Sequence, residues 1–232
     1  LHGLSQETPI GQWRDHLPWS RTIAVTDAGA TIYCATQNGI IVFDKAENSM
    51  RRLTKVNGLS DIGINDIQYS KDLNTLVIAY TNTNIDIIKG ETIINIPDIK
   101  RKQILGNKSL NKITLKDDYA YLSCGFGIVV LDVLKEEIHD TYYIGPGGTQ
   151  INVKDITFND TAIFAATESG IYHAPVDDPN LANFAIWEKF QDFYPSMEFD
   201  LITKYNESLI TNKNNTSTNN KDTLSIHNGS SW

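Results

Sequence analysis

One short phrase recurs along the chain, and its spacing limits the possible folds more than any other feature. It reads TIYCATQNGIIVFD at Thr31–Asp44, returns as YAYLSCGFGIVVLD at Tyr119–Asp132, and returns again as AIFAATESGIYHA at Ala162–Ala174. In each copy, an alternating run of strand-forming residues leads through a short turn into a nearly continuous apolar run. Such a phrase predicts two antiparallel strands, the second of them buried on both faces.

The turn of each copy marks a regular period. The marker residues are Gly39, Asn84, Gly127 and Gly170, which are separated by steps of 45, 43 and 43 residues. A period in the low forties with four short strands per repeat is typical of a β-propeller blade. The sequence therefore predicts an all-β fold, a β-propeller of four-stranded blades.

The repeat divides residues 1–232 into units at about 21–61, 62–106, 111–150, 152–190 and 197–232, which we interpret as the N-terminal part of one propeller. In the first two units the expected strands are Thr22–Thr26, Thr31–Thr36, Gly39–Asp44, Ser49–Thr54, Asn65–Tyr69, Thr75–Tyr80, Asn84–Ile88 and Thr92–Ile96. In the next two they are Lys112–Leu115, Tyr119–Ser123, Gly127–Asp132, Glu137–Tyr142, Lys154–Phe158, Ala162–Thr167, Gly170–Ala174 and Ala185–Phe190. The fourth strands carry charges, which indicates a solvent-facing rim.

The fifth copy is degenerate. Its strands are expected at Ser208–Thr211 and Thr223–Ile226, on either side of the polar insert Asn212–Lys221, which we interpret as a hairpin loop. No window shows the apolar stripe of a helical repeat, and Lys189–Met197 is the one piece for which we expect a turn or two of helix.

The start of the chain resembles the end of the fourth unit. Trp13 sits in its segment much as Trp187 does, so residues 10–16 form a candidate ring-closing strand. Five units and one unpaired strand would not close into a regular propeller ring. We therefore expect the propeller to be incomplete and the chain to be a fragment of a longer polypeptide.

Bulk composition excludes several classes of protein. The net charge is −8 and the pI is near 5.1, which argues against a nucleic-acid binder because such proteins need a basic stripe. Apolar runs such as Gly127–Leu131 are too short to span a bilayer, and no export signal is visible. Cys34 and Cys124 belong to different units, so we expect buried free thiols rather than a disulfide.

Known catalytic motifs are absent from the sequence. Gly145–Thr149 is rich in glycine but lacks the lysine of a phosphate-binding loop, so we expect a connection between blades. The pairs Asp117–Asp118 and Asp177–Asp178 fit turns better than calcium loops. The histidines show no ligand spacing and are expected to be structural or solvated; they are His2, His16, His139, His173 and His227. We predict no enzyme, no catalytic residue, no metal and no cofactor.

One basic cluster stands out in this acidic chain. It comprises Lys100, Arg101 and Lys102, with Lys108 and Lys112 nearby. A solvated loop between the second and third units is the main interpretation, because short charge runs are seldom specific. The alternative is a contact for an anionic glycan or a partner protein. Trp19 and Tyr194 could stack on sugars if they are exposed.

The connection between the first two units is more specific than the period. Leu53–Asp61 reads LTKVNGLSD and is followed by INDI at Ile64–Ile67; Ile32–Ile40 and Ile163–Ile171 share a further pattern, Ile-Tyr/Phe-x-Ala-Thr-x-x-Gly-Ile. Together they resemble the two-component regulator propeller repeat. Asn84 departs from this pattern, where the other units have glycine, and so does the fifth unit. Within that family, residues from Ile10 to about Trp187 are similar to the propeller subunit of the Bacteroidetes type IX secretion system.

This resemblance implies a non-enzymatic binding and scaffold subunit at the bacterial cell surface, associated with the outer membrane. Its implied partners are a sortase, other attachment-complex proteins and anionic lipopolysaccharide, to which secreted cargo is joined. It implies no site residues, because the matching residues build the fold. The alternative is a periplasmic sensor propeller of a hybrid two-component regulator that recognises glycans. A propeller hydrolase or lyase is a third reading, which would need convergent acid and base residues.

Overall fold

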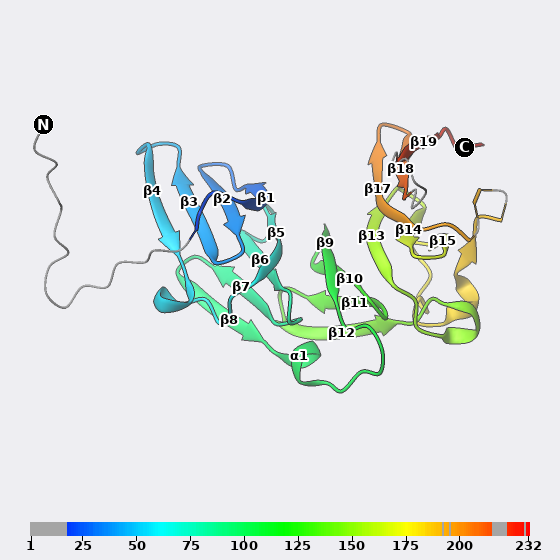
Figure 1. The fold of residues 1–232 in the computed structure, drawn as a ribbon, viewed down its shortest axis with the longest axis horizontal. Helices are drawn as coiled ribbons and strands as arrows, with labels where there is room; N and C mark the ends of the chain where they lie inside the picture. Colours follow the sequence, from blue (N-terminus) through cyan, green and yellow to red (C-terminus); the bar gives the residue numbers. More distant parts are fainter. Residues whose placement is uncertain (1–17, 192, 195, 215–221, 230) are drawn as a thin grey trace, which may run out of the picture.

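The computed structural model describes residues 18–191, 193–194, 196–214, 222–229 and 231–232. Their strands form five antiparallel sheets that follow one another along an open arc (Figure 1), which is an incomplete β-propeller. In each sheet the strands are ordered from the concave side outward as they occur in the sequence. The candidate ring-closing strand at residues 10–16 lies outside the described residues, as do residues 215–221 of the polar insert.

The first three sheets each have four strands. They are β1 (Thr22–Asp27), β2 (Thr31–Thr36), β3 (Gly39–Asp44) and β4 (Ser49–Leu53); β5 (Ile64–Ser70), β6 (Thr75–Tyr80), β7 (Ile85–Lys89) and β8 (Thr92–Ile96); and β9 (Leu110–Lys116), β10 (Tyr119–Cys124), β11 (Gly127–Asp132) and β12 (Glu137–Tyr142). The 3₁₀ helix η1 (Lys55–Asn57) joins the first sheet to the second, and the short helix α1 (Asp98–Arg101) follows β8.

The last two sheets are smaller at their outer edges. They contain β13 (Val153–Phe158), β14 (Ala162–Thr167), β15 (Gly170–Pro175) and β16 (Glu188–Lys189), then β17 (Phe199–Tyr205), β18 (Ser208–Lys213) and β19 (Thr223–His227). The 3₁₀ helices η2 (Pro146–Gly148) and η3 (Phe184–Ile186) lie in the connections.

The strands expected from the sequence are confirmed in the first three sheets to within about two residues at each end. Three expectations are wrong. The strand Ala185–Phe190 shrinks to β16 after η3, because only Glu188 and Lys189 pair with β15. No helix forms within the described part of Lys189–Met197, where Phe193 instead packs its ring against Phe199. The basic run at 100–102 begins in α1 rather than in a plain loop.

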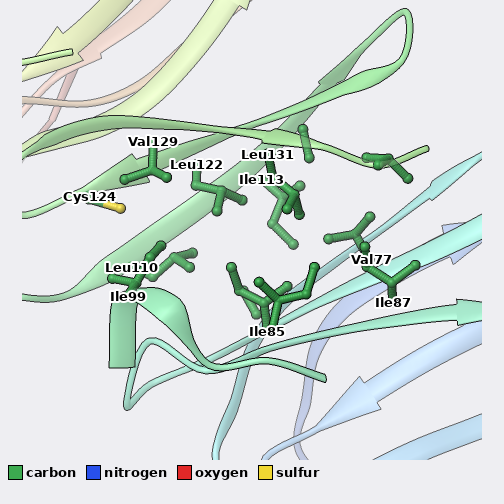
Figure 2. Close-up of a cluster of buried hydrophobic side chains, with 14 of the residues drawn as sticks. Val77, Ile85, Ile87, Ile99, Leu110, Ile113, Leu122, Cys124, Val129 and Leu131 are labelled. Carbon is green, nitrogen blue, oxygen red and sulfur yellow. The ribbon is translucent and has the colours of Figure 1, made fainter. Parts of the chain in front are cut away.

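The hydrophobic core is divided among the gaps between consecutive sheets. In β6, Val77 and Ala79 face the third sheet, whereas Leu76, Ile78 and Tyr80 face the first, because successive side chains of a strand alternate between its faces. Every residue of β11 is buried, as expected for a strand covered on both sides. Figure 2 shows the cluster between the second and third sheets, where Ile85 and Ile87 approach Ile113 and Leu131.

All five inner strands carry a β-bulge at the same place. The bulge lies between Thr22 and Ala24 in β1 and recurs at the equivalent positions of β5, β9, β13 and β17. A bulge re-aims the residues around it. In the second sheet the bulged residue is Asn65, whose Nδ2 donates to the carbonyl of Leu110 at 2.7 Å. In the third sheet, Asn111 Nδ2 likewise donates to the carbonyl of Val153 at 2.6 Å. In the fourth, Lys154 instead forms an ion pair with the Glu198 carboxylate at 2.7 Å.

The residue after the bulge makes a second link between sheets. Asp66 accepts a hydrogen bond from the amide of Ile113 at 2.8 Å, and Asp155 accepts one from the amide of Ile202 at 3.1 Å. Burial raises the pKa of both carboxyls, to about 6 for Asp155, although these amides and the nearby positive charge of Lys112 oppose the rise. The bulges of β5, β9 and β13 therefore fix each of these inner strands against the next one.

The glycines of the hairpin turns are required by a close approach of the outer strand. A Cβ at Gly127, where φ is +146°, would lie 2.2 Å from the carbonyl oxygen of Tyr142. At Gly39 it would lie 2.4 Å from the carbonyl oxygen of Leu53. Any side chain at either position would push the fourth strand away from the third.

We expect Gly127→Ala to lower the free energy of unfolding by about 1–3 kcal/mol beyond the conformational cost of its positive φ, because the added methyl group overlaps the Tyr142 carbonyl. Gly90→Ala is the control, since φ there is +59° but no atom lies within 4 Å of the added Cβ. It should cost only the conformational term of about 1–2 kcal/mol. Equal urea midpoints for the two variants would contradict the close approach.

The Asp155 carboxyl should titrate near pH 6 in carbon-detected NMR, against about 4 in the unfolded chain. A raised folded-state pKa means that the folded chain binds the extra proton between these values. The stability contributed by this group is therefore complete below about pH 4 and falls by about 3 kcal/mol as the pH rises through 6. Asp155→Asn should remove this pH dependence, whereas Asp27→Asn, at an exposed ion pair, should retain it. A midpoint near 4 would show that the carboxyl is not desolvated.

Candidate functional site

The connection between the first two sheets ends in a buried carboxylate that anchors α1. Asp61 is only 8% exposed, and its Oδ2 accepts hydrogen bonds from Lys100 Nζ at 2.6 Å and from Asn82 Nδ2 at 2.6 Å. Lys55 Nζ lies 3.6 Å from the other oxygen. Burial raises the pKa of Asp61, but the hydrogen bonds from Lys100 and Asn82 outweigh it and hold the pKa well below its usual range.

The departure of Asn84 from the repeat pattern belongs to the same network. Its Nδ2 donates to Asp61 at 3.3 Å, and its Oδ1 accepts from Asn95 Nδ2 at 3.0 Å. Thr83, at φ +65°, supplies the left-handed residue of this turn. Asparagine therefore replaces glycine here because its side chain ties the turn to the preceding connection and to β8.

A second buried carboxylate fixes the rest of this connection. Asp86 accepts hydrogen bonds from the amide of Ser60 at 2.8 Å, from Tyr80 Oη at 2.6 Å and from Asn95 Nδ2 at 2.9 Å. Burial and this carboxylate raise the pKa of the Tyr80 hydroxyl far above its usual value. Ser60 and Asp61, the last two residues of the Asn-Gly-Leu-Ser-Asp phrase, thus tie it to the second sheet and to α1.

The basic cluster predicted from the sequence separates into three environments. Lys100 is paired with Asp61, and Lys108 Nζ donates to the carbonyls of Lys100 at 2.8 Å and Lys102 at 2.6 Å, which satisfies the end of α1. Lys112 lies on β9, where its charge acts on Asp66 and Asp155. These three lysines contribute to the architecture.

Arg101 and Lys102 remain. Both side chains are exposed, and neither makes an ion pair with any carboxylate of the described residues. They line a pocket of about 450 Å³ whose other walls come from α1, the loop after it, the turn before β11, and the strands β11 and β12. This pocket is the candidate functional site. The sequence indicated its cations but not the hollow beside them.

The acidic pairs and the glycine-rich segment form turns and connections. Asp117 occupies the left-handed position of the β9–β10 hairpin at φ +52°, and Asp178 Oδ1 accepts from the amide of Asn180 at 2.8 Å. Gly145–Thr149 contains η2 and joins the third sheet to the fourth. Within the described ranges, no group of three or more histidine, cysteine, aspartate or glutamate side chains is placed to hold a metal ion.

The predicted histidine and aromatic residues pack against neighbouring side chains. The rings of His173 and His227 lie 4.6 and 5.6 Å from that of Phe190, and His139 lies 5.1 Å from Tyr119. His2 and His16 lie outside the described residues.

Trp19 and Tyr194 are each covered by a cation. Trp19 is half-buried beneath the guanidinium of Arg52, and Tyr194 is exposed with Lys213 Nζ 3.9 Å from its ring centre. The described structure thus brings neither ring to the candidate site.

The two cysteines are free, as expected, but only Cys124 is fully buried; Cys34 is partly exposed on β2. Burial raises the pKa of the Cys124 thiol well above its usual value, which keeps it protonated. In the part of the chain that the structure describes, no helix has the length and apolar character needed to cross a membrane.

Asp61→Asn should destabilise the chain by about 1–3 kcal/mol, because it leaves Lys100 without its partner and sets a buried amide against the amide groups of Asn82 and Asn84. Since the pKa of Asp61 is lowered, its contribution is present at neutral pH and is lost only as the pH falls below about 4. Asp27→Asn, at an exposed pair with Lys45, should have a much smaller effect in the same thermal unfolding assay, because solvent screens that pair. Equal effects of the two substitutions would contradict the anchoring role.

Comparison with known proteins identifies the fold family. Residues 32–188, more than half of the chain, match the family model of the type IX secretion protein PorZ, N-terminal β-propeller domain. The solved structure of PorZ, described as an essential bacterial surface component of the type IX secretion system of Porphyromonas gingivalis, is 23% identical with a TM-score of 0.74. The alignment covers 88% of this chain and 28% of PorZ.

Propellers of sensory proteins are similar too. The extracellular domain of BT4673 from B. thetaiotaomicron, described as a hybrid two-component system, is 15% identical with a TM-score of 0.63, over 92% of this chain and 28% of that one. No curated protein matches the chain. The chain thus spans little more than a quarter of the length of these solved structures, and its likeness to them shows the propeller fold. The family match over residues 32–188 is the more specific finding, and by it the chain belongs to the PorZ N-terminal β-propeller family of the type IX secretion system.

Proposed function

We propose that this propeller is a non-enzymatic binding and scaffold module of the type IX attachment complex. In this role it acts at the bacterial cell surface beside a sortase and helps to join secreted cargo to anionic lipopolysaccharide. The observation that carries the proposal is the family match over residues 32–188. The solved relative described as an essential surface component of this secretion system supports it.

The buried carboxylates hold the scaffold together, which argues against a role for them in acid–base catalysis. Asp66 and Asp155 each hold an amide of the neighbouring inner strand, Asp86 holds Ser60, and Asp61 holds Lys100. A catalytic acid or base must reach a substrate proton, and these groups are already committed to the scaffold. The exposed positive charge of Arg101 and Lys102 is better suited to attracting an anion.

A sensor of glycans in a hybrid two-component system is the second candidate. The similarity to the extracellular domain of BT4673 favours it, since the two propellers share their blade architecture. In that role the propeller would lie in the periplasm and transmit binding to a kinase. Fold alone does not separate the two candidates, because one fold supports different functions.

Deletion of the full-length gene tests the proposal. Cargo that carries the secretion sorting signal should then be retained, keep its signal or leave the cell without lipopolysaccharide, and the wild-type gene should restore normal processing. Immunoblots of cell and medium fractions, with antibodies to cargo and to anionic lipopolysaccharide, measure this outcome. Normal cargo maturation together with a lost response to polysaccharides would overturn the proposal in favour of the sensor.

A further inference from the structure

The pocket beside α1 combines an apolar floor with a basic rim. Ile99, Phe126 and Val129 line it and are at most 4% exposed, as members of the cluster between the second and third sheets. In Figure 2, Ile99 projects from α1 toward Leu110 and Cys124, on the side from which Val129 of β11 also approaches. The floor is therefore part of a packed core and does not need to form when a ligand arrives.

The rim is held in place by the backbone of α1. The amide of Lys102 donates to the carbonyl of Asp98 at 2.9 Å, and Lys108 Nζ spans the carbonyls of Lys100 and Lys102. The Lys100–Asp61 pair fastens the same turn to the connection between the first two sheets. Arg101 and Lys102 thus project from a fixed segment, and only their flexible side chains must become ordered on binding.

Charge and size together define the ligand. The chain carries a net charge of −8, yet at this rim two cations lack a carboxylate partner within the described residues. A pocket of about 450 Å³ lies within the usual range for small molecules and is too small for a polysaccharide chain. A solvated charge run explains two exposed cations but does not explain why they border an apolar hollow.

We propose that this pocket binds a phosphate or carboxylate attached directly to an apolar body. The anionic head would accept charge-assisted hydrogen bonds from Arg101 and Lys102. The apolar body would lie against the partly exposed Ile104 and Ile138, which pack on the buried floor. Asp98 also borders the pocket and opposes an anion, which sets the position of the head nearer the two cations. The inference names a ligand class for the proposed binding module. It rests on the proposed function only for where in the cell the ligand comes from.

The test uses three probes that separate head from body. 1-Naphthyl phosphate carries both, 1-naphthol carries only the apolar body, and inorganic phosphate carries only the head. In calorimetry and amide NMR shift titrations of the chain, the first should bind saturably and at least about tenfold more tightly than the other two. Its shifts should centre on Ile99, Phe126, Val129 and Ile138. Equal binding of 1-naphthol, or shifts centred elsewhere, would overturn the proposal.

Variants test each part of the pocket. Arg101→Gln with Lys102→Gln should weaken 1-naphthyl phosphate about tenfold or more, Asp98→Asn should strengthen it severalfold, and Lys71→Gln, at an exposed site between β5 and β6, should change nothing. Ile104→Trp should fill the pocket and weaken binding while leaving the two cations in place. An unchanged melting temperature would show that this variant is folded. Unchanged affinity in the double variant would overturn the proposal.

Two further comparisons identify the source of the ligand and separate the two proposals. Decyl phosphate below its micellar concentration represents the end of a long-chain lipid, and tighter binding than 1-naphthyl phosphate would assign the pocket to a lipid rather than to a compact molecule. Failure of both phosphates to bind would overturn the pocket while leaving the secretion role to the deletion experiment. Binding of either with normal cargo maturation in the deletion strain would leave the pocket standing and remove the secretion role.

Discussion

The whole architecture depends on strands that bury both of their faces. β7 and β11 are covered on each side by a neighbouring sheet, so their isoleucine, valine and leucine side chains are divided between two hydrophobic clusters. Burial of an aliphatic side chain provides about 1.5–3 kcal/mol, and these strands repeat that contribution along the arc. The hairpin glycines, the charged outer strands and the short connections all follow from keeping these strands enclosed.

Polar groups set the geometry that burial alone leaves open. Apolar faces would tolerate a sheet sliding against its neighbour, but Asp66 and Asp155 each require one particular amide of the next inner strand. Asn65 and Asn111 add direct contacts with the next backbone from the bulged position. Because an unpaired buried carboxylate or amide is costly, a slipped arrangement is excluded. Hydrogen bonds thus determine how each blade is placed on the one before it.

Much of the fold could be predicted from the sequence, because the period-two alternation and the turn residues are local signals. The strands around Gly39 and Gly127 were recovered from these signals almost to the residue. The segment after Pro175 was not, since Trp187 and Phe193 are used to fill gaps between sheets and their partners lie far away in sequence. α1 was missed because a four-residue helix has no periodic pattern.

The candidate site was predictable only in part. The run Lys100–Lys102 is visible in the sequence, but its division depends on Asp61, a residue of the preceding connection, which pairs with Lys100 and leaves two cations without an ion pair among the described residues. The apolar floor comes from α1, the turn before β11 and β11 itself, and no sequence spacing brings Ile99 beside Phe126. Tertiary contacts therefore created the pocket from residues that separately appeared to be a solvated loop and ordinary core.

The division of the core into separate clusters between adjacent sheets has a consequence for how such a chain can change over time. A substitution on one face of a blade alters the packing against one neighbour only, so it can be compensated by that neighbour while the remaining interfaces stay as they were. Substitutions can then accumulate at one interface between sheets at a time while the backbone fold stays the same. This chain and PorZ share the propeller fold, with a TM-score of 0.74, at 23% identity.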